Sequence, residues 1–210
     1  MKIKICGLTE VNNISDILFL NPDYIGFIFY PASPRYIEDK LSPGDIISLK
    51  PGAKKTGVFV NSDFYEISGI YWKYYLDSVQ LHGEESPELC KQLKASGMEI
   101  IKAFRVKEDF DFRSIADYIP FCRYFLFDTY TELKGGSGKK FDWRIINNYD
   151  LGHPFFLSGG ISPLDAGDIS GISHPSLQGV DLNSRFEDSP GIKNIAKLEK
   201  FIKQLRGVEI

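Results

Sequence analysis

The segment Lys2–Val11, KIKICGLTEV, begins with an apolar run that ends in a cysteine and a glycine. An open doubly wound sheet usually carries the glycine pattern GxGxxG directly after its first strand, and this segment lacks that pattern. Seven further short runs follow, rich in β-branched and aromatic residues, and their carboxyl ends recur roughly every 22 to 31 residues. Such runs are typical of strands buried on both faces. They read YIGFIF (24–29), KTGVFV (55–60), SVQLH (78–82), EIIKAFRV (99–106), RYFLFDT (123–129), PFFLSGG (154–160) and LQGVDLN (177–183).

Segments with helical spacing lie between these runs. Eight strands that alternate with helices predict a parallel sheet, and about 25 residues per unit suits a (β/α)8 TIM barrel with little decoration. The open doubly wound sheet is the competing architecture. Because no composition shift divides the chain, we expect one domain over residues 1–210. The clearest predicted helices cover Val11–Leu20, Phe64–Tyr75, Pro87–Ser96, Ile161–Ile172 with Ser162 as N-cap, and Ile192–Leu205.

The composition excludes several classes of protein. Of the 210 residues, 43% are hydrophobic and 25% are charged, and the net charge is −3 at pH 7. No lysine- or arginine-rich run stands out, so nucleic acid is not an expected partner. The apolar stretches are far too short to span a bilayer, and no signal-peptide pattern opens the chain. We therefore expect a cytoplasmic protein without a membrane partner.

The three cysteines, Cys6, Cys90 and Cys122, lie far apart, and no CxxC or Cys/His cluster accompanies them. This spacing argues against structural zinc and against a disulfide framework. Only His82 stands at a strand end, so a catalytic metal is not expected either. We interpret Cys90 and Cys122 as inert. Cys6 stands at the end of the first strand, where an inert and a reactive thiol both fit the pattern.

Polar residues and glycines gather at the carboxyl ends of the predicted strands, where barrels of this type place their active sites. Arg35, in the loop segment PASPRY, could clamp a carboxylate or a phosphate there. The glycines after strand seven and the polar residues after strand eight stand where such barrels often bind phosphate, aided by a helix N-terminus. The residues expected at this mouth are Cys6, Arg35, Gln80, His82, Asp128, Gly159, Gly160, Asp181, Asn183 and Ser184.

Strand alternation makes a further prediction about Cys6. If Cys6 points into the barrel, Lys4 points inward as well, one layer deeper. Asp181 points inward on strand eight, which lies beside strand one in a closed barrel. A buried lysine needs a partner, so we predict a Lys4–Asp181 ion pair that also supports a thiolate at Cys6. Gly7 is expected to clear space beside the thiol for a substrate.

The segment GGSGKK (135–140) superficially resembles a nucleotide-binding P-loop. The pattern GxxxxGK[ST] would need a glycine at Leu133 and a hydroxyl residue at Lys140, so the segment fails it. We interpret it as a glycine loop that closes over the site and contributes Gly136 to substrate binding. A plain surface loop is the alternative.

Taken together and in order, the motifs of this chain resemble those of the phosphoribosylanthranilate isomerases of tryptophan biosynthesis. The resemblance implies a (β/α)8 barrel without a cofactor. It implies conversion of N-(5-phosphoribosyl)anthranilate, a small phosphosugar substrate, to 1-(o-carboxyphenylamino)-1-deoxyribulose 5-phosphate. A monomer and a homodimer both remain open. The motifs are KICGLT, GFIFYPASPRY, GVFVN, VQLHG, IKAFRV, LFDT followed by GGSGKKFDW, LSGGI, and GVDLNSRFE with a later PGIK.

The resemblance also implies roles for single residues. Cys6 is the implied general base, Asp128 the implied general acid, and Arg35 the partner of the anthranilate carboxylate. Gly159 and Gly160, with the loop after strand eight, are expected to hold the ribose phosphate. That loop departs from the family pattern, because Arg185 stands where the family has a glycine. The alternatives are another phosphosugar isomerase or epimerase, and a phosphosugar-binding barrel without catalysis.

Overall fold

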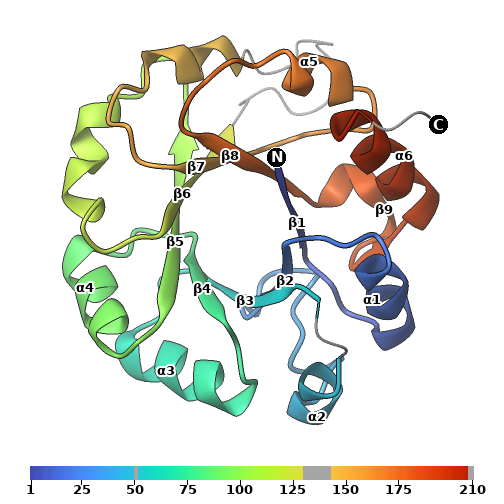
Figure 1. Ribbon diagram of the computed structural model, residues 1–210. Coiled ribbons are helices and arrows are strands. Elements are labelled where there is room, and N and C mark those ends of the chain that lie inside the picture. Colours follow the sequence, from blue (N-terminus) through green and yellow to red (C-terminus); the bar gives the residue numbers. More distant parts are fainter. Residues whose placement is uncertain (50–51, 130–142, 208–210) are drawn as a thin grey trace.

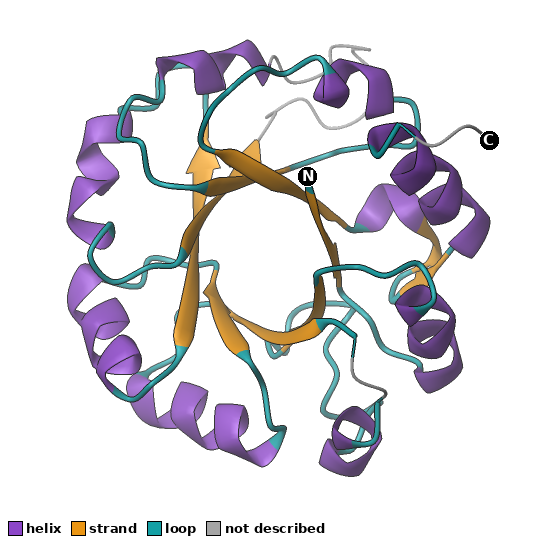
Figure 2. Ribbon diagram, viewed as in Figure 1, coloured by secondary structure: helices purple, strands orange, loops and turns teal. Residues whose placement is uncertain are grey.

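A computed structural model describes residues 1–49, 52–129 and 143–207. Eight parallel strands pair in sequence order and close into a barrel, so the predicted fold class is confirmed (Figures 1 and 2). Strand β8 closes the ring on β1, with Lys4 in register with Asp181. The strands are β1 (Lys2–Cys6), β2 (Tyr24–Ile28), β3 (Lys54–Phe59), β4 (Ser78–Leu81), β5 (Glu99–Val106), β6 (Tyr124–Thr129), β7 (Phe155–Ser158) and β8 (Leu177–Leu182).

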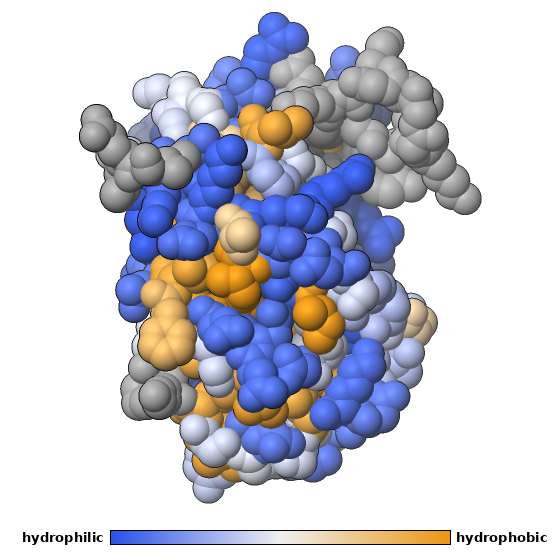
Figure 3. All heavy atoms as spheres, turned by 90° about the vertical axis from the view of Figure 1, so that its right-hand side faces the viewer, coloured by the Kyte–Doolittle hydropathy of each residue, from blue (hydrophilic) through white to orange (hydrophobic). Residues whose placement is uncertain are grey.

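Helices form a ring around the outside of the barrel (Figure 2). Their apolar sides pack on the strands, and one large buried cluster fills the space between the two layers. On the side that carries α1 and α6, hydrophilic side chains cover most of the surface, with smaller apolar patches between them (Figure 3). The α-helices are α1 (Val11–Leu18), α2 (Pro43–Ile47), α3 (Phe64–Lys73), α4 (Pro87–Ala95), α5 (Ala166–Ser170) and α6 (Ile195–Leu205).

Shorter elements complete the connections. A small antiparallel hairpin follows β8 and precedes α6. Within the described residues, no helix is long and apolar enough to cross a membrane. The short elements are the 3₁₀ helices η1 (Phe112–Tyr118), η2 (Trp143–Asn148) and η3 (Ser184–Phe186), and the hairpin strands β9 (Glu187–Ser189) and β10 (Ile192–Lys193).

Side-chain caps start most of the helices. The Ser42 hydroxyl and the Asp45 carboxylate form a capping box at the start of α2. Asp63 caps α3 by accepting hydrogen bonds from two backbone N–H groups. Ser86 caps α4, and Pro87 follows at the first helical position, where its missing N–H costs nothing. The Glu10 carboxylate caps α1 in the same way as Asp63 caps α3. These local caps explain why the predicted helices that correspond to α1, α3 and α4 agree with the structure to within two residues.

Two predicted helices begin later than expected. The helix predicted over Ile161–Ile172 is only α5, with Asp165 and not Ser162 as N-cap residue. The Asp165 carboxylate accepts hydrogen bonds from the backbone N–H and the hydroxyl of Ser162, and this turn occupies the first residues of the predicted helix.

The second late start is at the C-terminal helix, predicted from Ile192. There the chain first forms β10, and the Asn194 side chain then caps α6 by accepting a hydrogen bond from the backbone N–H of Lys197.

The interior of the barrel is filled below the mouth. Tyr24, Tyr124 and Phe156 meet edge to face, with ring centroids 5.1 to 6.3 Å apart. Together with neighbouring apolar side chains they form a second buried cluster. Since alternate residues of a strand share a face, Leu126 in this cluster and Asp128 point to the same side of β6, with Asp128 nearer the carboxyl end. The interior packing thus forms a floor beneath the polar mouth.

Candidate active site

A cavity of about 240 Å³ lies at the carboxyl ends of the barrel strands. Arg35 lies beside this cavity and not in its lining. Gly136 lies outside the described residues. The other predicted site residues all line the cavity, namely Cys6, Gln80, His82, Asp128, Gly159, Gly160, Asp181, Asn183 and Ser184.

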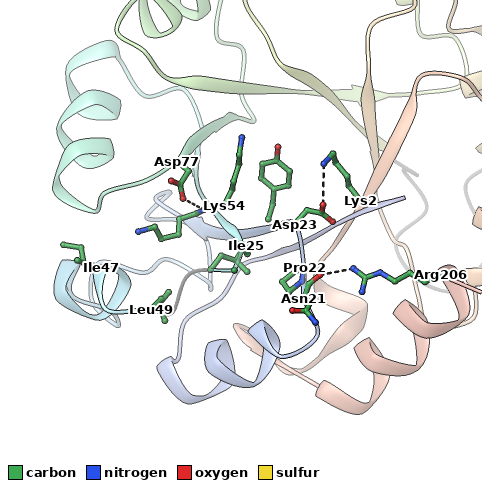
Figure 4. Close-up of a pocket in the computed structure, with 14 residues that line it drawn as sticks. Lys2, Asn21, Pro22, Asp23, Ile25, Ile47, Leu49, Lys54, Asp77 and Arg206 are labelled. Carbon is green, nitrogen blue, oxygen red and sulfur yellow. Dashed lines mark hydrogen bonds and ion pairs between the residues drawn. The ribbon is translucent and has the colours of Figure 1, made fainter. Parts of the chain in front are cut away.

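A larger cavity, of about 800 Å³, lies at the opposite end of the barrel, where β1, β2 and β3 begin (Figure 4). There Asp23 accepts hydrogen bonds from the Lys2 ammonium at 3.5 Å and from the backbone N–H of Ile3 at 2.9 Å. Arg206 donates to the backbone carbonyl of Asn21 at 2.9 Å. These polar groups hold the strand starts and the end of α6 together. The described residues that line this cavity include none of the predicted site residues.

The predicted ion pair beneath Cys6 is confirmed. The Lys4 ammonium lies 2.9 Å from the Asp181 carboxylate, and their side chains are 0% and 6% exposed. Burial by itself lowers the pKa of Lys4, but the charge of Asp181, with a smaller contribution from Cys6, outweighs it, so the net pKa is raised. Burial raises the pKa of the Cys6 thiol, and the charge of Lys4 opposes this without cancelling it. Burial therefore favours the thiol form of Cys6, and the Lys4 cation is in place to stabilise the thiolate once it forms.

Two glycines make room for these groups. Gly26 is the register partner of Cys6 on β2, and a Cβ at Gly26 would lie 2.6 Å from the Cys6 sulfur. A Cβ at Gly7, whose φ is +77°, would instead lie 2.6 Å from Cδ of Arg35 and 2.9 Å from Oδ1 of Asn183. The expectation for Gly7 is therefore corrected, because Gly26 clears the space beside the thiol and Gly7 admits Arg35 and Asn183.

A chain of hydrogen bonds reaches Asp128 from β4. The Gln80 side-chain nitrogen lies 3.1 Å from His82 Nδ1, and His82 Nε2 lies 3.1 Å from the Asp128 carboxylate. With Gln80 donating to Nδ1, the neutral imidazole carries its proton on Nε2 and donates to Asp128. The Gln80 side-chain oxygen is buried and has no hydrogen-bond partner among the described residues. The site thus holds a hydrogen-bond chain that ends on Asp128, and an open acceptor.

Arg35 is held by a carboxylate that sequence reasoning missed. Its Nε and Nη2 donate to the two oxygens of Glu187, at 2.8 and 2.5 Å. The buried Lys193 ammonium donates to Glu187 at 2.6 Å and to Asn183 at 2.7 Å. Glu187 and Lys193 belong to the motif segments RFE and PGIK, but nothing local in those segments indicates that they meet Arg35.

The glycines after β7 have the backbone freedom expected of an anion-binding turn. Gly159 and Gly160 have φ values of +92° and +64°, a region that favours glycine. The expectation of a helix N-terminus directly behind them is wrong, because α5 begins only at Ala166. Ser184, at the start of η3, lines the same cavity, and Arg185 is exposed and outside its lining.

Metal ligands do not gather here in the described part of the chain, where no group of three or more histidine, cysteine or acidic side chains is placed to hold an ion. The reactive groups of the site are a thiol, a carboxyl hydrogen-bonded to an imidazole, and neighbouring cations. These are groups for moving protons and binding anions.

Comparison with known proteins agrees with this architecture. A family model described as N-(5'phosphoribosyl)anthranilate (PRA) isomerase matches residues 3–204. An N-(5'-phosphoribosyl)anthranilate isomerase of Parabacteroides distasonis is 45% identical over 208 residues, covering 98% of this chain and 93% of that protein. The crystal structure of phosphoribosyl anthranilate isomerase from Thermotoga maritima matches with a TM-score of 0.85 at 36% identity, covering 99% of this chain and 100% of that one.

A further solved phosphoribosyl anthranilate isomerase has a TM-score of 0.83 at 32% identity, with coverage of 99% and 100%. It is in complex with reduced 1-(o-carboxyphenylamino)-1-deoxyribulose 5-phosphate. The barrel, with ionisable groups gathered at the carboxyl ends of its strands, has the architecture of a (β/α)8-barrel enzyme. The family and structural matches specify which one. The chain belongs to the N-(5'-phosphoribosyl)anthranilate isomerase family, whose members are isomerases of tryptophan biosynthesis.

Proposed function

We propose that Cys6 is the general base and Asp128 the general acid in the isomerisation of N-(5'-phosphoribosyl)anthranilate. The observation that carries this assignment is that the thiol of β1 and the carboxyl of β6 line the same cavity. Strands β1 and β6 are not neighbours in the closed order. The two groups can therefore act on a bound sugar from different sides, as a reaction with separate proton donor and acceptor requires.

The reaction proceeds through an open-chain iminium. Asp128, in its protonated form, donates its proton to the ring oxygen while the C1–O bond breaks and the amine lone pair forms the C1=N bond. The positive nitrogen acidifies the proton on C2. Cys6, as thiolate, removes that proton, and the electron pair of the C–H bond forms C1=C2 and neutralises the nitrogen. The enolamine then tautomerises, losing its hydroxyl proton and gaining one at C1, to give the ketone.

Neighbouring groups support both steps. The Lys4 ammonium stabilises the thiolate as it forms, since its charge lowers the pKa of Cys6 against the effect of burial. After Asp128 has given up its proton, His82 Nε2 donates a hydrogen bond to the new carboxylate at 3.1 Å. A charge-assisted hydrogen bond of this kind is typically about twice as strong as a neutral one.

The remaining predicted residues are assigned to binding. Arg35 receives the anthranilate carboxylate, and Gly159 and Gly160 receive the phosphate together with Asn183 and Ser184. The open, buried oxygen of Gln80 accepts a hydrogen bond from a substrate hydroxyl. Asp181 contributes through Lys4, and Gly136 keeps its proposed role in the loop that closes over the site.

Other properties stay predictions from the sequence. They are a single domain over residues 1–210, a cytoplasmic location, and a monomer or homodimer. No nucleic acid or membrane partner and no cofactor is expected.

The test is steady-state kinetics with the fluorescent substrate. Cys6→Ala and Asp128→Asn are each expected to lower kcat by at least ~10²-fold with little change in KM, because each removes one proton-transfer group. Cys90→Ala and Asp117→Asn are matched controls, since Cys90 lies on α4 and Asp117 is exposed on η1. Turnover near the wild-type rate in either Cys6→Ala or Asp128→Asn overturns the assignment.

A further inference from the structure

A charged cluster lies beside the cavity and outside the proposed proton-transfer machinery. It consists of Arg35 from the loop after β2, and Glu187 and Lys193 from the β9–β10 hairpin. The side chains of Glu187 and Lys193 are 5% and 0% exposed, and that of Arg35 is 17% exposed. Charges this deeply buried are expensive unless they are paired and hydrogen-bonded, so their arrangement needs an explanation.

The hairpin is fixed to the barrel by its own hydrogen bonds. The backbone N–H and carbonyl of Lys193 both bond to the Asn13 side chain of α1, each at 2.8 Å. The backbone N–H of Gly191 donates to the Glu187 carboxylate at 3.1 Å. The Glu187 carboxylate therefore stands on a rigid support, and it accepts four hydrogen bonds, two from Arg35, one from Lys193 and one from Gly191.

The pairing uses only one edge of the Arg35 guanidinium. An arginine side chain has five N–H groups, and Glu187 takes one from Nε and one from Nη2. The other three, both on Nη1 and one on Nη2, have no hydrogen-bond partner among the described residues. This free edge can bind a second carboxylate through two parallel hydrogen bonds.

The charges of the cluster do not cancel. Glu187 alone would neutralise Arg35, but Lys193 adds a second buried cation, and the three side chains together carry one positive charge. Lys193 also lies within hydrogen-bond distance of Asn183, which lines the cavity. The cluster therefore keeps an attraction for an anion even though Arg35 is already paired.

We propose that Glu187 and Lys193 are positioning residues that hold Arg35 by one edge of its guanidinium and present its free edge to the anthranilate carboxylate. The net positive charge of the three side chains then attracts that carboxylate. This inference rests on the proposed role of Arg35. It adds two residues that act through Arg35 and do not touch the substrate. It also explains why a carboxylate is buried beside an anion-binding arginine, where a simple charge argument would exclude it.

The test measures binding with two probes by calorimetry. One is reduced 1-(o-carboxyphenylamino)-1-deoxyribulose 5-phosphate, and the other is the same compound without the carboxyl group. The ratio of their Kd values reports the carboxylate contact alone. Binding is preferable to turnover because the charge of Lys193 also lowers the pKa of Cys6.

The Kd ratio of the Glu187→Gln variant shows whether Glu187 positions Arg35 or only adjusts the charge of the cluster. The substitution makes the cluster more positive, so a role in charge alone predicts a stronger preference for the carboxylated probe. Positioning predicts a preference about 10- to 100-fold weaker, the range for loss of a well-oriented charge-assisted contact. An unchanged or increased preference overturns the proposal, as does equal weakening of both probes, which is the mark of a purely structural role.

Further variants keep the test independent of folding. Lys193→Met should weaken the preference at least ~5-fold, since the remaining Arg35–Glu187 pair is neutral. In an Arg35→Met background, Glu187→Gln should have no added effect on the preference, and an added effect overturns the proposal. If Arg35→Met alone leaves the preference unchanged, the proposed role of Arg35 itself fails. The exposed pair Glu199 and Lys203 on α6 supplies matched controls, Glu199→Gln and Lys203→Met.

Discussion

Gly26→Ala places a single methyl group against the proposed catalytic thiol. The new Cβ would lie 2.6 Å from the Cys6 sulfur, 3.1 Å from the Cys6 Cα and 3.2 Å from its Cβ. Comfortable contact between such atoms needs about 3.5 to 4.0 Å, so the sulfur must move by roughly 1 Å. The backbone cannot yield easily, because the Gly26 carbonyl accepts hydrogen bonds from the N–H groups of Gly7 and Leu8.

Two consequences follow from this displacement. Overpacking of a filled core typically costs about 1–3 kcal/mol of unfolding free energy, which for a chain of this size lowers Tm by roughly 2–12 °C. A misplacement of about 1 Å at a reacting group can cost about 10²-fold in rate. We therefore expect Gly26→Ala to lower kcat by ~10²-fold, while the affinity for the reduced product analogue changes little.

The assay is substrate fluorescence for kcat, with calorimetry for Tm. Gly69→Ala is the matched control, because Gly69 lies in the middle of α3 with nothing within 4 Å of a new Cβ. That substitution should keep full activity and raise stability by about 0.5–1 kcal/mol through helix propensity. If the Gly26→Ala enzyme keeps kcat within ~3-fold of wild type, the Cys6 thiol does not depend on the missing side chain at position 26, and the reasoning is refuted.

Three other substitutions or conditions test the surroundings of Cys6. Lys4→Met should cost about 3–5 kcal/mol because it leaves Asp181 buried without its partner, and Lys4→Met/Asp181→Leu should recover much of this in urea unfolding; no recovery would contradict a pairwise role. Since burial raises the pKa of Cys6 and the base must be a thiolate, kcat/KM should rise with pH through the neutral range, and a plateau below pH ~7 would disagree. Gly7→Ala, strained at φ +77° and crowding Arg35, should raise KM more than it lowers kcat, and an unchanged KM would disprove it.

The strands were predictable because their signal is local. Each is a short run of β-branched and aromatic residues bounded by polar ones, and burial on both faces of a parallel sheet leaves that pattern in the sequence. All eight observed strands lie within two residues of the predicted runs. Once the barrel is assumed, alternation along β1 and β8 is enough to place Lys4, Cys6 and Asp181 together.

The hairpin and its role were not predictable in the same way. Strand β10 is two residues long and lies inside a segment whose apolar spacing also suits a helix, so a prediction by periodicity extends the helix over it. The bond from Arg35 to Glu187 joins residues 152 positions apart. No periodic pattern reports such a contact, because it depends on ring closure bringing the segment after β8 next to the loop after β2.

By itself, the sequence determined the barrel class, the strand positions, the inward face of β1 and the set of polar residues at the mouth. Hydrophobic periodicity and strand alternation are short-range properties. They can be read from each segment of the sequence without knowing where that segment lies in the fold. Only the tertiary structure decided that Gly26 borders the thiol, that His82 reaches Asp128, and that Glu187 holds Arg35. These are contacts of a few ångströms between distant segments, and the register of neighbouring strands and the path of each loop must be known before any of them can be inferred.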